Sequence, residues 1–259
     1  MGYAQLILAS VVFLPIFFST PGPLRGVAAL EYNQSWPRDS ILLNTDWHYG
    51  YWYQIEPGYV PMLKTTTFAD GLAYLADRNY DGYVMFLNEP EIYNQDDVSP
   101  AVAADMYAAL VAALPTAKII GPNVWWNGPG NGPTWLMTWH TEIVARGLPL
   151  PYGYATHYYE FTLPNQPWMA ADALRALARS WGEYDAEIWL PEFTTCKGSA
   201  ELRLILAQLD SRLWLNRYAF FASRHNGAEW PTCRYELIDS AGKLTANGAV
   251  YARPAGPFR

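Results

Sequence analysis

The chain has 259 residues, of which 51% are hydrophobic, 16% aromatic and only 16% charged. This length fits one large domain of the barrel or sandwich type, and the low charge combined with abundant aromatic residues excludes a disordered chain. The formal net charge of −7 argues against a nucleic-acid partner, because binding to phosphates requires a basic surface.

The first recognisable element lies at the N-terminus. Residues 5–18 are almost entirely apolar, and the run Ser19-Thr20-Pro21-Gly22-Pro23 follows them. This stretch matches the ~7–15 apolar residues of a secretory signal peptide and is short for the ~20 residues of a membrane span. We predict that residues 1–23 are a signal peptide or an N-terminal anchor, with a buried first element as the alternative. A secreted or extracytoplasmic protein with a single domain over residues 24–259 is the resulting expectation.

Eight short apolar runs are typical of β-strands, and segments between them repeat apolar residues at helical spacing. Ser99 and Pro100 form a helix start, because serine is a good N-cap and proline fits the first turn. Strands that alternate with helices predict a parallel sheet, and eight of them can close into a (β/α)8 barrel, the TIM barrel. The predicted strands are residues 25–30, 41–46, 59–63, 83–88, 118–123, 152–159, 187–193 and 217–222.

Helices are poorly marked after the first three predicted strands, so we expect a compact barrel with short or missing helices. An open doubly wound sheet is the alternative, but no glycine-rich phosphate turn follows the first strand. The glycine- and proline-rich stretch at residues 128–133 follows two tryptophans, and its prolines would block entry into a helix. We interpret it as a loop.

The chain has two cysteines, Cys196 after the seventh predicted strand and Cys233 after the eighth. Neighbouring loops could bring them within disulfide range. A secreted chain favours that pairing, and an intracellular one would leave both as thiols. Neither cysteine has CxxC spacing and the four histidines have no metal-ligand spacing, so we expect no metal or cofactor.

Two glutamates end otherwise apolar strands. Glu89 follows the fourth strand, and Pro90 disfavours a helical backbone there, which predicts an extended pose. Glu192 ends the seventh strand, and the alternation of strand residues places it on one face with Ile188 and Leu190. A buried carboxylate is costly unless it is paired or functional. Taken alone, either could instead cap the next helix; together, at the carboxyl ends of two barrel strands, they predict an active site.

The pair of motifs Asn88-Glu89-Pro90 and Glu192-Phe193 resembles the retaining glycoside hydrolases of clan A. Further motifs are similar to glycoside hydrolase family 128, whose members are endo-β-1,3-glucanases with a short (β/α)8 barrel. The resemblance extends from Arg25 to Tyr251. The motifs are Arg25-Gly26-Val27-Ala28, Val60-Pro61-Met62-Leu63, His157-Tyr158-Tyr159, and the tail Ile238-Asp239-Ser240-Ala241-Gly242-Lys243-Leu244-Thr245 followed by Gly248 and Tyr251.

The resemblance implies that Glu89 is the general acid/base and Glu192 the nucleophile of a double displacement. It also implies that Asn88 donates to the sugar 2-hydroxyl and that Tyr159 orients Glu192. His157, two residues earlier, would contact substrate or else be a core histidine. If Glu192 were not the nucleophile, Glu160 would replace it.

Four tryptophans are predicted on the catalytic face, each as a sugar-stacking platform or as packing. They are Trp47, Trp125, Trp126 and Trp230. Many rings with few charges suit a neutral polysaccharide or oligosaccharide substrate, and we expect a monomer. The alternatives are another clan A glycosidase, xylosidase-like or a β-1,4-endoglucanase, and a barrel that binds glycan without cleaving it.

Overall fold

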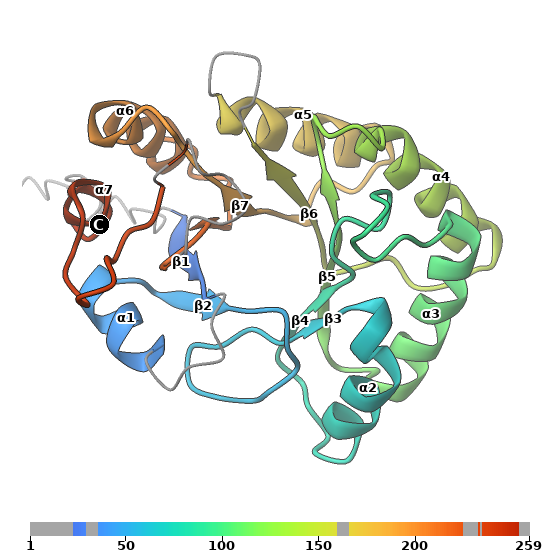
Figure 1. The fold of residues 1–259 in the computed structure, drawn as a ribbon. Helices are drawn as coiled ribbons and strands as arrows, with labels where there is room; N and C mark the ends of the chain where they lie inside the picture. Colours follow the sequence, from blue (N-terminus) through green and yellow to red (C-terminus); the bar gives the residue numbers. More distant parts are fainter. Residues whose placement is uncertain (1–22, 30–35, 160–165, 225–232, 234, 254–259) are drawn as a thin grey trace, which may run out of the picture.

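The computed structural model describes residues 23–29, 36–159, 166–224, 233 and 235–253. Eight parallel strands are hydrogen-bonded in the order β2-β1-β8-β7-β6-β5-β4-β3, and helices surround them (Figure 1). The predicted compact (β/α)8 barrel is confirmed. The strands are β1 (Leu24–Ala28), β2 (Trp47–Tyr49), β3 (Met62–Leu63), β4 (Tyr83–Phe86), β5 (Lys118–Trp125), β6 (Gly153–Tyr158), β7 (Glu187–Phe193) and β8 (Arg217–Phe220).

The ring of strands is completed between β2 and β3, the two ends of the hydrogen-bonded order. The His48 amide donates to the Gly58 carbonyl at 2.9 Å, and the Val60 amide donates to the His48 carbonyl at 2.9 Å. No helix lies in residues 50–61, which connect these strands. The barrel is therefore nearly closed by the chain that leads into β3.

The helices of the described ranges are short. Among the described residues, none of the helices is long and apolar enough to span a bilayer. The predicted signal or anchor segment lies almost wholly outside those residues. The helices are α1 (Trp36–Leu43), α2 (Phe68–Ala76) after a 3₁₀ turn (Thr65–Thr67), α3 (Pro100–Ala113), α4 (Gly132–Ala145), α5 (Pro167–Ser180), α6 (Ser199–Asp210) and α7 (Ala246–Tyr251).

Prolines at helix starts explain one correct prediction and one wrong one. The Ser99 hydroxyl accepts from the Val102 amide at 3.4 Å and Pro100 begins α3, as predicted. Pro133 was expected to block a helix, yet it lies in the first turn of α4. The first-turn amide has no partner within a helix, so a proline costs nothing there. Only residues before Gly132 form the predicted loop.

The second predicted strand is wrong: residues 41–43 form the end of α1, residues 44–46 connect it to the sheet, and β2 begins at Trp47. A short apolar run does not by itself distinguish a helix from a strand. In the structure Leu43 is buried while Ile41 is 82% exposed, which is the one-sided burial of a surface helix. Asn44, with φ at 51°, ends the helix in the left-handed conformation.

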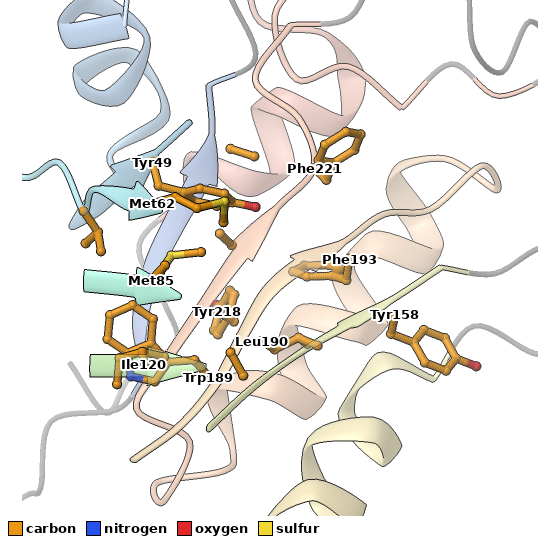
Figure 2. Packing of buried hydrophobic residues seen from close by; sticks show 14 of the residues in the cluster. Tyr49, Met62, Met85, Ile120, Tyr158, Trp189, Leu190, Phe193, Tyr218 and Phe221 are labelled. Carbon is orange, nitrogen blue, oxygen red and sulfur yellow. The ribbon is translucent and has the colours of Figure 1, made fainter. Parts of the chain in front are cut away.

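A continuous apolar core fills the space within and around the sheet (Figure 2). Met62, Met85 and Ile120 are register neighbours on β3, β4 and β5, and each is fully buried. Such side chains fix the strands relative to one another. The carboxyl ends of the strands can therefore hold functional side chains in fixed positions.

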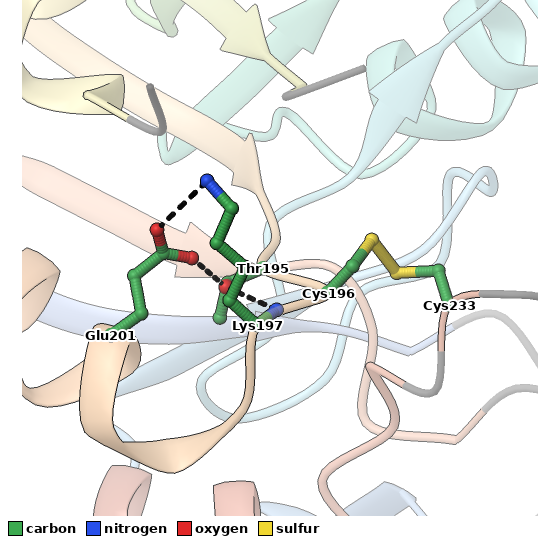
Figure 3. The surroundings of a disulfide bond; sticks show 5 residues. All are labelled: Thr195, Cys196, Lys197, Glu201 and Cys233. Atoms are coloured by element: carbon green, nitrogen blue, oxygen red, sulfur yellow. Dashed lines mark hydrogen bonds and ion pairs between the residues drawn. A yellow bond between two sulfur atoms is a disulfide. The ribbon is translucent and has the colours of Figure 1, made fainter. Parts of the chain in front are cut away.

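The disulfide between Cys196 and Cys233 is present, which confirms the predicted pairing (Figure 3). The two Cα atoms are 4.8 Å apart across a sequence separation of 37 residues. The bridge ties the loop after β7 to the chain after β8. Both segments lie at the end of the barrel that carries Glu89 and Glu192.

Candidate active site

Glu89 lies just beyond β4 in a constrained turn. Its φ is 46° and that of Leu87 is 59°, so both have left-handed backbone. The predicted extended pose of Glu89 is therefore wrong, although Pro90 still excludes the right-handed helical region. Hydrogen bonds hold the turn: the Leu87 amide donates to the Leu63 carbonyl at 2.9 Å and the Glu89 amide to the Asn123 carbonyl at 2.7 Å. Such conformations cost ~1–3 kcal/mol each and persist where neighbours enforce them, often at active sites.

Asp96 supports this turn from the loop before α3. Its carboxylate accepts from the Asn88 amide at 2.6 Å and from the Thr65 amide and hydroxyl, each at 3.0 Å. Burial raises the pKa of Asp96, and these donors oppose that rise. Asp96 thus joins the end of β3 to the turn that carries Glu89.

Two β-bulges adjust the strands on either side of the site. Relative to β6, β5 has one extra residue at Gly121-Pro122. Relative to both β6 and β8, β7 has one extra residue around Pro191. The simple alternation that placed Glu192 with Leu190 is therefore interrupted. Bulges tolerate proline and redirect the residues that follow them. Here those residues are Asn123 and Glu192.

Glu192 is 1% exposed and is surrounded by phenolic donors. The hydroxyls of Tyr49 and Tyr51 donate to Oε1 at 2.7 and 2.9 Å, and the Tyr159 hydroxyl donates to Oε2. The expected contact between Tyr159 and Glu192 is thus present. A carboxylate that accepts several hydrogen bonds is stabilised in its ionised form.

His157 lies between the two glutamates. Its Nδ1 is 3.0 Å from Glu89 Oε1 and 3.3 Å from Glu192 Oε2. Burial lowers the pKa of His157, but the two carboxylates outweigh burial and raise it above its ordinary value. The ring has no exposed surface, which favours the core-histidine alternative over substrate contact.

The carboxylates are close enough to perturb each other. One ligand atom each from Glu89, His157 and Glu192 lie within 4.8 Å of one another, and no other described group of metal-ligand side chains is as compact. Burial raises the pKa of Glu89, the charge of Glu192 adds to this rise, and His157 and Lys64 oppose it. One protonated and one ionised carboxyl group is the expected state of such a pair.

The tryptophans predicted to stack on sugar rings differ in position where the structure describes them. Trp125 and Trp126 are half-buried at the end of β5. Trp47 is a correction: it begins β2 at the opposite end of the barrel, is 1% exposed and donates from Nε1 to the Leu24 carbonyl. It cannot stack on a sugar at the carboxyl ends of the strands. Trp230 and the substitute nucleophile Glu160 lie outside the described residues.

Sequence reasoning missed Tyr49 and Tyr51. They stand at and just beyond the end of β2, and the misplaced second strand hid them. With β2 at its true position, the alternate spacing of the two tyrosines would have been the usable signal. Lys64 was missed as well, and its Nζ lies 4.7 Å from the centre of the Tyr51 ring.

Solved structures with the same fold include two enzymes described as family 128 endo-β-1,3-glucanases. The one from Amycolatopsis mediterranei, in complex with laminaritriose, is 21% identical over 89% of this chain and 99% of that chain, with a TM-score of 0.67. The one from Pseudomonas viridiflava is 21% identical over 88% and 96%, also with a TM-score of 0.67.

A third similar structure is described as a curdlan-specific exo-β-1,3-glucanase from Blastomyces gilchristii in complex with glucose. It is 21% identical over 90% of this chain and 99% of that chain, with a TM-score of 0.67. The comparison with curated proteins found no match. The family model described as "Glycosyl hydrolase catalytic core" matches residues 27–251. Because that match spans most of the sequence, the chain belongs to this glycosyl hydrolase family.

Proposed function

We propose that this glycoside hydrolase is a retaining endo-β-1,3-glucanase of family 128. The observation that carries the mechanism is the compact arrangement of Glu89, His157 and Glu192 within 4.8 Å. Retaining enzymes hold their carboxyl groups ~5–5.5 Å apart, whereas inverting enzymes need ~6.5–9.5 Å to admit a water molecule. One oxygen of Glu89 and one oxygen of Glu192 lie within 4.8 Å of each other, and this closeness supports direct attack by one carboxylate.

The two environments assign the roles. Glu192 accepts hydrogen bonds from tyrosines, which suits an ionised nucleophile attacking the anomeric carbon. Glu89 has a raised pKa and can hold the proton that the leaving glycosidic oxygen requires. The first step forms a bond from Glu192 oxygen to the sugar and releases a protonated leaving group. In the second step Glu89, now ionised, takes a proton from water as that water displaces Glu192.

The choice of β-1,3-glucan is supported by the sequence resemblance and by what the similar structures bind. Those structures are described with laminari-oligosaccharides or glucose. The half-buried rings of Trp125 and Trp126 offer flat apolar surfaces beside the catalytic pair. Asn88, whose Nδ2 donates to Gln95 at 3.0 Å, is proposed to reach the sugar 2-hydroxyl.

A substrate panel tests this proposal. The protein is incubated with laminarin, cellulose, xylan and mannan, product sizes are measured over time, and proton NMR records the first anomer released. We expect laminarin to be cut into intermediate oligosaccharides with β-anomers formed first. Release of glucose alone would indicate exo action, early α-anomers would indicate inversion, and cleavage of another polysaccharide with laminarin intact would refute the linkage.

We also propose that the protein acts outside the cytoplasm as a monomer, with residues 1–23 directing export. The disulfide supports a location outside the cytoplasm, because disulfides persist mainly in oxidising compartments. A variant that starts at residue 24 should be soluble and active when produced in an oxidising compartment. Soluble full-length protein together with an insoluble truncated variant would contradict the proposed role of the leader.

A further inference from the structure

Glu91 is a half-buried residue whose carboxyl group the proposed reaction does not use. It follows the acid/base Glu89 by two residues and points to the loop after β5. Its Oε1 accepts from the Trp125 amide at 2.6 Å. Its Oε2 is also buried and has no hydrogen-bond partner in the described part of the chain. A group that costs this much to bury needs a reason to be there.

The glycine-rich loop after β5 closes around this carboxyl group. A Cβ atom at Gly130 would lie 2.7 Å from Glu91 Cγ, and one at Gly132 would lie 3.0 Å from Glu91 Oε1. At Gly128 a Cβ would lie 2.6 Å from the Trp125 ring. The three glycines therefore let the loop approach Glu91 and Trp125 more closely than any other residue would permit.

The same loop reaches the nucleophile through side-chain contacts. The Trp125 ring meets the Tyr159 ring edge-on at 5.5 Å, and Trp125 Nε1 donates to Asn127 Oδ1 at 3.0 Å. Asn127 Nδ2 donates to the Tyr159 carbonyl at 2.7 Å, and the Tyr159 hydroxyl donates to Glu192. A continuous path of contacts thus connects Glu91 to both halves of the site.

We propose that Glu91 is a positioning residue that fixes Trp125 and the loop over residues 126–131 as a sugar-binding surface beside Glu89 and Glu192. It does so by accepting the Trp125 amide within a cradle of glycines. The inference rests on the proposed glucanase function for its ligand, a neutral β-glucan chain. Glu91 itself touches neither substrate nor the reacting atoms.

The electrostatics of Glu91 agree with this geometry. Burial raises its pKa to about 7, the charge of Glu89 adds to the rise, and the Trp125 amide and His157 oppose it. Glu89 and His157 are the titratable groups that face it. The hydrogen bond from the Trp125 amide to Glu91 persists in both protonation states, because the oxygen of a neutral carboxyl group also accepts hydrogen bonds.

Two substitutions separate hydrogen bonding from charge. Glu91→Gln keeps an oxygen at the Oε1 position, and Glu91→Ala removes it. With laminarin as substrate, we expect Glu91→Ala to raise KM about tenfold with a much smaller change in kcat, and Glu91→Gln to restore KM to within about twofold. Hydrogen exchange of the peptide containing Trp125 should be at least about tenfold faster in Glu91→Ala and normal in Glu91→Gln.

Two more variants provide a second test and a control. Gly130→Ala should reproduce the raised KM by pushing the loop off Glu91, and Glu142→Ala on the outer face of α4 should change nothing. The inference is overturned if Glu91→Ala has wild-type KM and exchange, or if Glu91→Gln is as impaired as Glu91→Ala. If the wild-type protein cleaves no β-1,3-glucan, the proposed function fails. In that case, hydrogen exchange in wild type, Glu91→Ala and Glu91→Gln still tests whether Glu91 holds the loop.

Discussion

At the residue scale, the proposed nucleophile Glu192 is held by tyrosines that come from two different strands and the loops after them. Tyr49 and Tyr51 belong to β2 and its following loop, whereas Tyr159 follows β6. All three direct hydroxyl groups at Glu192. The carboxylate is thereby held in one orientation by three hydroxyl donors, and His157 Nδ1 lies 3.3 Å from its Oε2.

Replacing Tyr51 with phenylalanine tests the contribution of one such donor. A hydrogen bond to a charged group is worth ~1.5–3 kcal/mol, so kcat should fall by about one to two orders of magnitude. The free energy of unfolding should change far less, because Tyr51 is only half-buried. Tyr184→Phe, at a 69% exposed position, is the matched control. Unchanged kcat in Tyr51→Phe would show that the hydroxyl is dispensable.

The raised pKa of Glu91 makes stability depend on pH. Its folded value is about 7 against an ordinary value of 4.5, so the folded state holds the proton that the unfolded state loses. This contribution to stability is therefore fully present below pH 4.5 and is lost as the pH rises to 7. We expect the unfolding free energy of wild type, relative to Glu91→Gln, to fall by up to ~3 kcal/mol across that window. Urea titrations of both proteins at the two pH values check this, and parallel pH curves would contradict it.

At the element scale, the position of each proposed catalytic side chain depends on how one strand ends. A left-handed turn follows β4, a bulge interrupts β7, and the disulfide joins the segments after β7 and β8. These irregularities lie beside the site. The opposite end of the barrel is closed by aromatic rings around Arg217, whose guanidinium lies 4.5 Å from the Tyr83 ring and 4.6 Å from the Trp189 ring.

The disulfide should stabilise the fold mainly by restricting the unfolded chain. In the loop-closure model, a bridge across 37 residues contributes roughly 3–4 kcal/mol. Changing Cys196 and Cys233 together to serine should lower the unfolding free energy by about this amount, and reductant should have the same effect on wild type but none on the variant. A wild-type protein whose unfolding is insensitive to reductant would contradict the expectation.

Sequence reasoning succeeded where an element has its own local signal. The apolar run of β4 ending in Asn88-Glu89-Pro90 identified both the strand and its carboxylate, and Ser99-Pro100 marked the start of α3. It failed where the signal was ambiguous. The apolar run at residues 41–46 predicts a strand where the structure has the end of α1, and this error predicts the wrong end of the barrel for Trp47 and hides Tyr49.

Contacts that depend on tertiary structure also could not be predicted from the sequence. The left-handed φ of Glu89 is imposed by hydrogen bonds to neighbouring strands, and the bulge at Pro191 is visible only in the pairing of β7. The support that Asp96 gives to Asn88 depends on where the loop before α3 folds. None of these follows from spacing along the chain.

At the scale of the whole molecule, Arg25 joins the two ends of the barrel chain. Its guanidinium donates to the Tyr218 hydroxyl at 2.8 Å, to the Tyr251 carbonyl at 2.6 Å and to Asp210 at 2.9 Å. These partners lie on β8, α7 and α6, whereas Arg25 lies on β1. One buried side chain therefore links the first strand to the last elements of the fold.

Removing one partner of this buried ion pair should be costly. We expect Arg25→Met to lower the unfolding free energy by ~3–5 kcal/mol, because it leaves Asp210 without its cation. Arg146→Ala is the control: Arg146 pairs with Asp105, whose side chain is 75% exposed, and such surface pairs contribute ~0–1 kcal/mol. Equal losses in the two variants, measured by urea unfolding, would contradict a special role for Arg25.

In the proposed double displacement, Glu89 is the acid/base and Glu192 is the nucleophile. Azide rescue of Glu89→Ala tests this assignment most directly. With an aryl β-glucoside or aryl laminaribioside carrying an acidic phenol, the first step needs little protonation. Glu89→Ala should then form the glycosyl-enzyme, and azide, which needs no base, should restore turnover and give the β-glycosyl azide. If Glu89→Ala is as inert towards the activated substrate as towards laminarin, and azide restores nothing, the assignment is wrong.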